Sequence, residues 1–243
     1  MTETLVMLHG GGTDARCWDL VRPLLARHFE VLTPDLPGHR DAPAPKANTV
    51  AALAAPVADW IAGTVRGPYH LLGHSLGGMV AMTIADGGPV PERLILADTF
   101  DRAAHGWTDW GRLVVLALGA RAIGRDQATV KVAEMHGLGH DGFDATLRAS
   151  MHHKSAMGLG QMLDAVRRFD GRPILDRLPM PTLVLTAGEN PATRAPGLRM
   201  EAQLAQGRRV VMPGAGHMQM RDDPEGFARA VLDFLAADLS RSA

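Results

Sequence analysis

The sequence has little cysteine and no long apolar run, and both shortages limit what the protein can be. A single cysteine, Cys17, occurs in 243 residues, so no disulfide can form within the chain. This usage is typical of a reducing compartment, and we expect a cytoplasmic protein in which Cys17 fills apolar space early in a helix. No stretch of about 18 uncharged apolar residues is present, which argues against a membrane span. The first residues also lack a basic segment followed by an apolar one, so we expect no signal peptide.

An excess of charge of either sign is also missing. The formal net charge is −1, with 25 Lys and Arg against 26 Asp and Glu. This balance gives no reason to expect a nucleic acid or an anionic membrane as partner. A hydrophobic content of 46% and a charged content of 21% are ordinary for a globular domain, and 243 residues fit one domain with an insertion. The composition leaves the oligomeric state open.

The stretch around which the chain is organised is Gly-His-Ser-Leu-Gly-Gly, residues 73–78. An apolar run precedes it and a small, apolar helical pattern follows it. The Gly-x-Ser-x-Gly spacing is typical of a sharp turn from a strand into a helix, because Gly73 and Gly77 have no Cβ and let the two elements crowd together. Such a turn exposes the Ser75 hydroxyl. It also places the Leu76 N–H at a helix N-terminus, where negative charge is favoured.

Short apolar runs alternate with helical patterns along the rest of the chain. Runs of this kind are typical of strands buried on both faces, and we expect strands at residues 5–8, 29–33, 69–72, 93–98, 182–186 and 208–212. Helices are expected at residues 15–27, 49–65 with Thr49 as N-cap, 196–206 and 224–237. The alternation predicts an α/β fold with a mostly parallel sheet of about six strands flanked by helices. Ligands of such sheets lie beyond the carboxyl ends of the strands, where His9, Ser75 and Asp98 fall.

Three motifs together resemble the α/β-hydrolase superfamily, and the resemblance covers nearly the whole chain. They are the serine turn, the upstream His-Gly-Gly-Gly of residues 9–12 and the downstream Gly-Ala-Gly-His of residues 214–217. In detail the motifs look most like those of compact esterases, methylesterases and hydroxynitrile lyases. The resemblance implies an α/β-hydrolase fold. The loop at residues 35–39 also matches the family's Asp-x-Pro-Gly-His, but Arg40 stands where a second glycine is usual, so we expect a local difference there.

The chemistry requires a nucleophile, a base and donors for an oxyanion. Ser75 alone is a poor nucleophile and needs a base within hydrogen-bond reach, which His217 can supply from a glycine-flanked loop after the last strand. His9 is expected to support the oxyanion loop. Two N–H donors must face the developing negative charge. We expect these donors on Leu76 and Gly11, with Gly12 in reserve.

The acid that orients the base is where the sequence departs from the family. The usual acid follows the strand at residues 182–186, and the aligned position holds Asn190, which can accept a hydrogen bond but carries no charge. Glu189 is adjacent and charged. Asp98 lies 23 residues past Ser75, at the end of the next strand, where haloalkane dehalogenases and some lactonases of this superfamily carry their acid. Asp98 is the first choice, and Asn190 and Glu189 stay open as alternatives.

The strand pattern stops between residues 99 and 179, where only helical patterns occur. The resemblance implies an all-helical cap (lid) at 99–179, inserted into a core domain formed by 1–98 and 180–243. We expect substrate-pocket residues on both parts, because aromatic and methionine side chains can line an adaptable apolar pocket. The candidates are His74, Trp107, Trp110, Met151 and Met218.

These expectations together favour one reaction class. The leading hypothesis is a serine hydrolase that cleaves a small, largely apolar carboxylic ester or lactone through an acyl-enzyme, without cofactor. No metal site is expected, because the adjacent pair His152 and His153 lacks the i, i+4 spacing of a helical metal site. The alternatives are a lyase, cyclase or isomerase on the same scaffold, or a small-molecule receptor.

Overall fold

Parallel strands form the centre of the computed structural model, which describes residues 2–102, 157 and 159–236. The described residues contain six strands: β1 (Thr4–Leu8), β2 (Glu30–Leu32), β3 (Tyr69–His74), β4 (Arg93–Ala97), β5 (Thr182–Ala187) and β6 (Gly207–Met212). They lie in the order β2-β1-β3-β4-β5-β6, and every neighbouring pair is parallel. The predicted α/β fold with about six mostly parallel strands is therefore confirmed.

The register brings the carboxyl ends of the central strands level with one another. Leu8 of β1 pairs with Gly73 of β3, which in turn pairs with Leu96 of β4. Leu96 pairs with Val184 of β5. The residues that follow these strands therefore emerge at one edge of the sheet, as is usual for ligand sites in parallel sheets.

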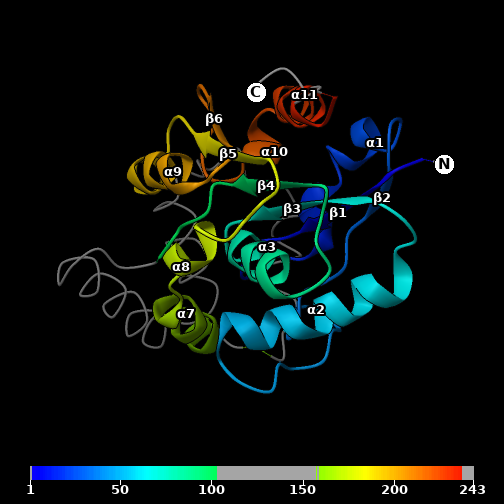
Figure 1. Cartoon of the computed structure of the whole chain (residues 1–243), viewed down its shortest axis with the longest axis vertical. Helices are drawn as coiled ribbons and strands as arrows, with labels where there is room; N and C mark the ends of the chain where they lie inside the picture. The colour runs from blue at the N-terminus through cyan, green and yellow to red at the C-terminus, as the bar shows by residue number, and fades with distance from the viewer. Residues whose placement is uncertain (1, 103–156, 158, 237–243) are drawn as a thin grey trace.

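Helices cover both faces of the sheet (Figure 1). On one face lie α2 (Val50–Thr64), α3 (Leu76–Gly87), α8 (Arg172–Leu175) and α9 (Pro191–Gln203). On the other lie the 3₁₀ helix η1 (Ala15–Trp18), α1 (Arg22–Leu25), α10 (Gln219–Asp222) and α11 (Pro224–Ala236). Alternate residues of each strand point to opposite faces, so Val6 packs in the first layer while Leu5 and Met7 pack in the second.

Two helix predictions need correction. The helix expected at residues 15–27 is interrupted between η1 and α1, because Pro23 has no N–H to continue a helical ladder and instead lies in the first turn of α1. The helix expected at 196–206 begins earlier, at Pro191, where proline is suited to the first helical position and the Asn190 side chain caps the turn. The N-cap at Thr49 is confirmed, since its Oγ1 accepts from the Ala52 N–H at 3.2 Å.

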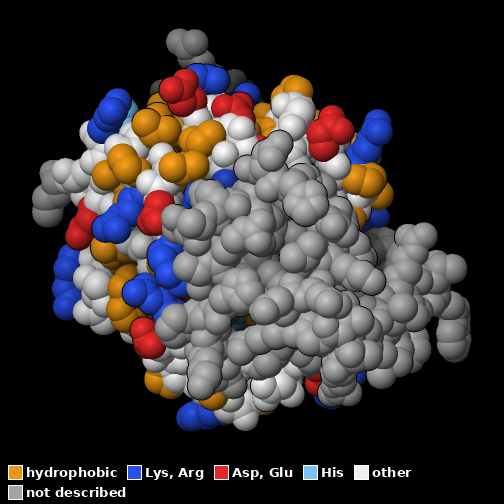
Figure 2. Space-filling view, turned by 180° about the vertical axis from the view of Figure 1, so that it is seen from behind, with side chains coloured by type: hydrophobic (Ala, Val, Ile, Leu, Met, Phe, Trp, Pro, Cys, Tyr) orange, Lys and Arg blue, Asp and Glu red, His pale blue; other side chains and the backbone are white. Residues whose placement is uncertain are grey.

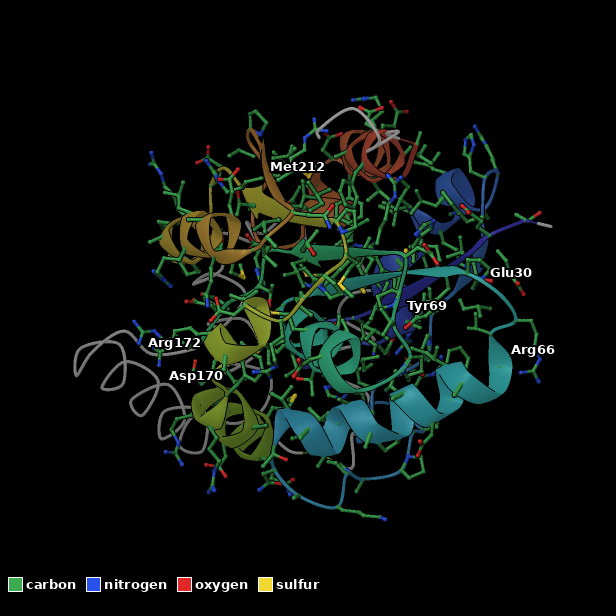
Figure 3. All side chains as sticks on the ribbon, in the orientation of Figure 1. Glu30, Arg66, Tyr69, Asp170, Arg172 and Met212 are labelled. Atoms are coloured by element: carbon green, nitrogen blue, oxygen red, sulfur yellow. The ribbon has the colours of Figure 1, made fainter. Side chains whose placement is uncertain are left out.

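The described ends of the segment at residues 99–179 meet close to the sheet. Arg102 forms an isolated antiparallel bridge with Asp170, and the Gly171 N–H donates to the Asp101 carbonyl at 2.7 Å. Helix α7 (Leu159–Arg168) lies in this segment, where the sequence shows only helical patterns. Asp170 and Arg172, paired at 2.6 Å, lie at the junction of α7 and α8 (Figure 3). The other expected helices of this segment lie outside the described residues, so its boundaries as a cap stay a prediction.

Figure 2 shows the face opposite to that of Figure 1. Where its described residues are visible, basic and acidic side chains lie near one another. Among residues 2–102, 157 and 159–236, no helix is long and apolar enough to cross a bilayer.

Candidate active site

Ser75 occupies a strained turn between β3 and α3. Its φ of 53° and ψ of −119° lie in a region that residues with a side chain rarely adopt, which costs on the order of 1–3 kcal/mol. The surrounding structure holds this conformation, since the Ser75 N–H donates to the Ala97 carbonyl at 3.0 Å and the Thr99 hydroxyl donates to the Ser75 carbonyl at 2.6 Å. The turn leaves the Ser75 side chain partly exposed at the carboxyl edge of the sheet.

The glycines of the serine motif allow the close approach that this turn needs. A Cβ on Gly73 would lie 2.2 Å from the Gly77 carbonyl oxygen, and one on Gly77 would lie 2.3 Å from the Leu8 carbonyl oxygen. A Cβ on Gly78 would lie 2.6 Å from the Thr99 side chain. These separations are too short for any residue larger than glycine, so the motif is fixed by packing between β1, β3 and α3.

His217 lies between Ser75 and Asp98. Its Nε2 is 3.2 Å from Ser75 Oγ, and its Nδ1 is 2.6 Å from Asp98 Oδ2. The Gly216 N–H donates to Asp222 Oδ2 at 2.8 Å, which holds the loop that carries the imidazole. Because Nδ1 faces a carboxylate, it carries the proton, and Nε2 is left as the acceptor for the serine hydroxyl.

Asp98 is a buried carboxylate whose oxygens are all engaged. Oδ1 accepts from the Ala187 N–H at 3.0 Å and from the Thr193 hydroxyl, while Oδ2 accepts from His217 and from Asn190 Nδ2 at 2.6 Å. Burial by itself raises the pKa of Asp98, but the hydrogen bonds from His217, Thr193 and Ala187 outweigh it and hold the pKa below its usual value. Asp98 is therefore ionised at neutral pH.

The two alternative acids are placed differently. Asn190 is buried, but its amide nitrogen, rather than its oxygen, faces Asp98, so it donates to the carboxylate. Asn190 Nδ2 also lies 3.3 Å from His217 Nδ1, yet both atoms carry hydrogens there, so this contact orients nothing by itself. The Glu189 side chain is exposed. Of the three candidates, only Asp98 presents a charge to His217.

The N–H groups expected to hold an oxyanion lie on both sides of the serine turn. Leu76 is the first residue of α3, so its N–H has no acceptor within the helix. Gly11 packs against Leu76, since a Cβ on Gly11 would lie 3.3 Å from Leu76 Cδ2. Among the hydrogen bonds of the described residues, neither of these two N–H groups has an acceptor.

His9 fixes the direction of the Gly11 N–H. Its Nε2 accepts from the Leu36 N–H at 2.9 Å, so Nδ1 carries the proton and donates to the Gly10 carbonyl at 2.8 Å. The Thr13 hydroxyl donates to the same carbonyl at 2.9 Å. Because the peptide group is planar and trans, the Gly11 N–H points away from that anchored carbonyl. Burial lowers the pKa of His9 to about 3, which keeps the ring neutral.

Gly12, the reserve donor, is already engaged. Its N–H donates to His39 Nε2 at 3.3 Å, while His39 Nδ1 donates to the Pro37 carbonyl at 3.2 Å. The rings of His9 and His39 meet edge to face, with centroids 5.0 Å apart. Burial also lowers the pKa of His39. The Asp-x-Pro-Gly-His loop contains this second histidine, but no sequence pattern indicates its contact with Gly12, which lies 27 residues away.

The structure describes two of the five pocket candidates, since Trp107, Trp110 and Met151 lie outside the described residues. His74 is buried and donates from Nε2 to the His217 carbonyl at 2.8 Å, so it supports the loop of the base. Met218 is buried in the core layer with α1 and α11. Their role in lining a substrate pocket stays a prediction.

Met162 of α7 is a neighbour of the site that sequence reasoning missed. Its Sδ lies 3.2 Å from His39 Nε2, and a Cβ on Gly11 would lie 3.4 Å from the same sulfur. One Met among 13 in the sequence carries no distinguishing pattern, so only the packing of α7 onto the oxyanion loop identifies it.

Comparisons with known proteins agree with this architecture. The sequence matches the family model described as "Alpha/beta hydrolase family" over residues 5–230. A pimeloyl-[acyl-carrier protein] methyl ester esterase of Neisseria meningitidis serogroup B (strain MC58) is 30% identical over 98% of this chain and 94% of its own length. A putative carbamate hydrolase, RutD, of Yersinia enterocolitica is 26% identical over 97% of this chain and 88% of its own.

Solved structures show the same fold. A hydrolase from Pseudomonas aeruginosa PA01 superposes with a TM-score of 0.81 at 29% identity, covering 97% of this chain and 91% of that one. The enol-lactonase from Burkholderia xenovorans LB400 has a TM-score of 0.81 at 24% identity, over 98% of this chain and 93% of that one. At that identity the second likeness concerns the fold alone.

Proposed function

Because this chain belongs to the alpha/beta hydrolase family, we propose that it is a serine hydrolase of a small, largely apolar carboxylic ester or lactone. The observation that carries the proposal is the hydrogen-bonded chain from Ser75 Oγ through His217 to the ionised Asp98, at 3.2 and 2.6 Å. The relatives with ester- and carbamate-hydrolase names support the same reaction class.

In the first half-reaction, Ser75 Oγ attacks the carbonyl carbon of the ester. His217 Nε2 takes the hydroxyl proton, and the negative charge of Asp98 stabilises the imidazolium that forms. The carbonyl oxygen becomes an oxyanion held by the N–H groups of Leu76 and Gly11, an interaction that is worth about 3–4 kcal/mol per donor in comparable sites. The carbon–oxygen bond to the alcohol then breaks, and the alcohol leaves with the proton from His217.

In the second half-reaction, water replaces the alcohol. His217 Nε2 takes a proton from the water as its oxygen attacks the acyl carbon, and the same two N–H groups hold the second oxyanion. The bond to Ser75 Oγ breaks, the serine recovers its proton from His217, and the carboxylic acid leaves. Every group used in this cycle belongs to the chain or to water, so the proposed cycle needs no cofactor.

The alcohol part and the acyl part of the substrate are inferred from different observations. Methyl ester hydrolysis is named for the Neisseria relative, so esters of small alcohols are the first to test here. The acyl part is expected to contact the segment at residues 99–179, which we propose acts as the cap and sets acyl specificity. The cytoplasmic location expected from the sequence also stays a prediction.

The test is hydrolysis of p-nitrophenyl and methyl esters of short acids, followed with a fluorophosphonate probe. We expect turnover, a single adduct on Ser75 by mass spectrometry, and loss of both in Ser75→Ala. Thr83→Ala is a matched control, because it removes a hydroxyl from helix α3, where Oγ1 donates to the Met79 carbonyl at 2.9 Å. An adduct on Ser75 without ester turnover would favour a lyase, cyclase or isomerase, and the absence of both would favour a receptor.

A further inference from the structure

We propose that Asn190 is a positioning residue for the acid: its amide holds Asp98 against His217, and only a hydrogen-bond donor can fill this place. The inference rests on the proposed function for its consequence in catalysis. It goes beyond that function because Asn190 stands where the superfamily's usual acid stands, yet it acts on another residue's carboxylate.

The orientation of the amide is fixed from both ends. Asn190 is the N-cap of α9, and its Oδ1 accepts from the Ala192 N–H at 3.3 Å. The opposite end of the same planar amide, Nδ2, is therefore the end that reaches Asp98 Oδ2 at 2.6 Å. A flipped amide would place an oxygen against the carboxylate and a nitrogen against the Ala192 N–H, and both contacts would be repulsive. Only 3% of Asn190 is exposed, so water cannot replace the lost contacts.

Asn190 acts on the base only through the acid. Asp98 Oδ2 receives two donors, one from Asn190 and one from His217 Nδ1, both at 2.6 Å. The Asn190 donor limits the positions that this oxygen can take, so it fixes the direction in which Asp98 accepts the imidazole N–H. Thr193 and the Ala187 N–H hold the other oxygen in the same way.

A carboxylate at position 190 would reverse this contact. Two buried carboxylates 2.6 Å apart cannot both be ionised without strong repulsion, so the pKa of one of them rises. While the carboxyl group introduced at position 190 kept its proton, its hydroxyl would donate to Asp98 as the amide does. Once that group lost the proton at higher pH, the two charges would push Asp98 away from His217.

The variant Asn190→Asp therefore separates the two contacts of this residue. Aspartate caps a helix as well as asparagine does, so the contact to Ala192 survives. The donor to Asp98 survives only at low pH. We expect kcat to fall with rising pH by about 10- to 100-fold, by analogy with the loss of hydrogen-bond partners that orient metal ligands, with KM nearly unchanged. A residue that only capped α9 would leave kcat independent of this change.

Ala195→Asp is the matched control, because it adds the same charge to an exposed position of the same helix. We expect it to keep the wild-type pH profile. The low-field proton NMR signal of His217 Nδ1–H supplies a readout that needs no ester turnover, since it reports the bond to Asp98 directly. It should persist at all pH values in wild type and Ala195→Asp, and disappear as pH rises in Asn190→Asp.

The outcomes separate this inference from the proposed function. A lasting signal and a flat kcat in Asn190→Asp would overturn the positioning role, as would the same losses in Ala195→Asp. An unlabelled Ser75 in wild type would overturn the hydrolase, whereas the NMR comparison would still test Asn190. If Asn190→Asp does not fold, the double variant Asp98→Asn/Asn190→Asp exchanges the two groups, so that an amide donor at position 98 again faces a carboxylate acceptor at position 190. Recovery of a folded protein would then support the pairing, and no recovery would contradict it.

Discussion

Ser75 lies between two groups of buried residues, the acid and its donors on one side and the oxyanion loop on the other, and different interactions hold each group in place. On the acid side, a buried and ionised Asp98 receives donors from β5, α9 and His217. On the oxyanion side, the glycine loop is held by two buried imidazoles, His9 and His39, whose hydrogen bonds are to backbone groups that carry no charge. The groups that hold each side are buried, but on the acid side they converge on a carboxylate, whereas on the oxyanion side the hydrogen bonds join uncharged groups.

The difference shows that surroundings, more than residue type, decide what a histidine does here. His217 Nδ1 donates to a carboxylate, whose negative charge stabilises the imidazolium that forms when the ring takes the serine proton. His9 and His39 are buried without a hydrogen-bonded carboxylate, and burial lowers the pKa of both. They are therefore suited to fix a loop, since a proton on His9 Nε2 would remove the acceptor of the Leu36 N–H.

The largest effect on activity is expected from a change on the acid side, at Asp98. Asp98→Asn keeps the shape of the side chain but removes its charge and allows the wrong tautomer of His217. We expect kcat to fall by about 10⁴-fold, as in other Ser-His-Asp sites. Thermal unfolding measured in parallel checks that the fold survives, because Asp98 is also a buried hydrogen-bond acceptor. A variant that folds and retains wild-type kcat would remove Asp98 from the mechanism.

A smaller effect on activity is expected when the carboxylate is moved from position 98, after β4, to position 190, after β5. In Asp98→Asn/Asn190→Asp, the carboxylate at 190 would occupy the position that now lies 3.3 Å from His217 Nδ1. We expect the double variant to exceed Asp98→Asn in kcat/KM by about tenfold or more, since contacting residues are not additive. Equal activity of the single and double variants would mean that only the end of β4 can supply the acid.

The buried histidine of the oxyanion side, His9, should make the free energy of unfolding depend on pH. Burial lowers the pKa of His9 to about 3, below its ordinary 6.5, so the unfolded chain binds more protons than the folded one between these values. The free energy of unfolding should therefore be highest above pH 6.5, and His9 alone should lower it by up to about 1.4 kcal/mol per pH unit as pH drops through this window. Urea denaturation at pH 7 and pH 5 measures the slope.

Two variants identify the group responsible. His9→Gln should make the slope between pH 7 and pH 5 shallower, and His39 and His70, whose pKa values burial also lowers, account for the slope that remains. His28→Gln changes an exposed side chain and should leave the slope unchanged. A slope that is the same in wild type and His9→Gln would assign the acid sensitivity to other groups. Asp98, whose pKa is below its usual value, contributes only at lower pH and does not confuse this window.

The smallest expected effect concerns Arg40, next to His39. Arg40 has a φ of 48°, the left-handed region that glycine adopts without cost. The loop therefore keeps a glycine-like backbone although the residue is not glycine. Arg40→Gly should raise the free energy of unfolding by about 1 kcal/mol, because the left-handed strain of a residue with a side chain is relieved. Unchanged or lower stability would show that its ion pair with Asp35, at 3.7 Å, outweighs the strain.

Much of the fold could be predicted from the sequence because its signals are local. Continuous apolar runs mark buried strands, and the glycine spacing of residues 73–78 leaves few alternatives to the turn at Ser75. The break between η1 and α1 was not predicted, because Trp18, Val21 and Leu25 keep helical spacing across it. Only Pro23 marks the interruption.

The site was less predictable where roles depend on the direction of a side chain. Asp98 could be proposed from its position after β4. That Asn190 donates to Asp98, and that His39 takes up the Gly12 N–H, depends on which end of a side chain faces which neighbour. These contacts join residues 92 and 27 positions apart, so no local pattern encodes them.

The central claim is that the carboxylate after β4, and not the residue after β5, orients His217 to activate Ser75. The most direct test is the second-order rate constant for fluorophosphonate labelling of Ser75 in Asp98→Asn and in Asn190→Ala, at one pH and on folded protein. We predict a loss of about 10⁴-fold in Asp98→Asn and a much smaller loss in Asn190→Ala. Labelling of Asp98→Asn at the wild-type rate, or a larger loss in Asn190→Ala, would contradict the claim.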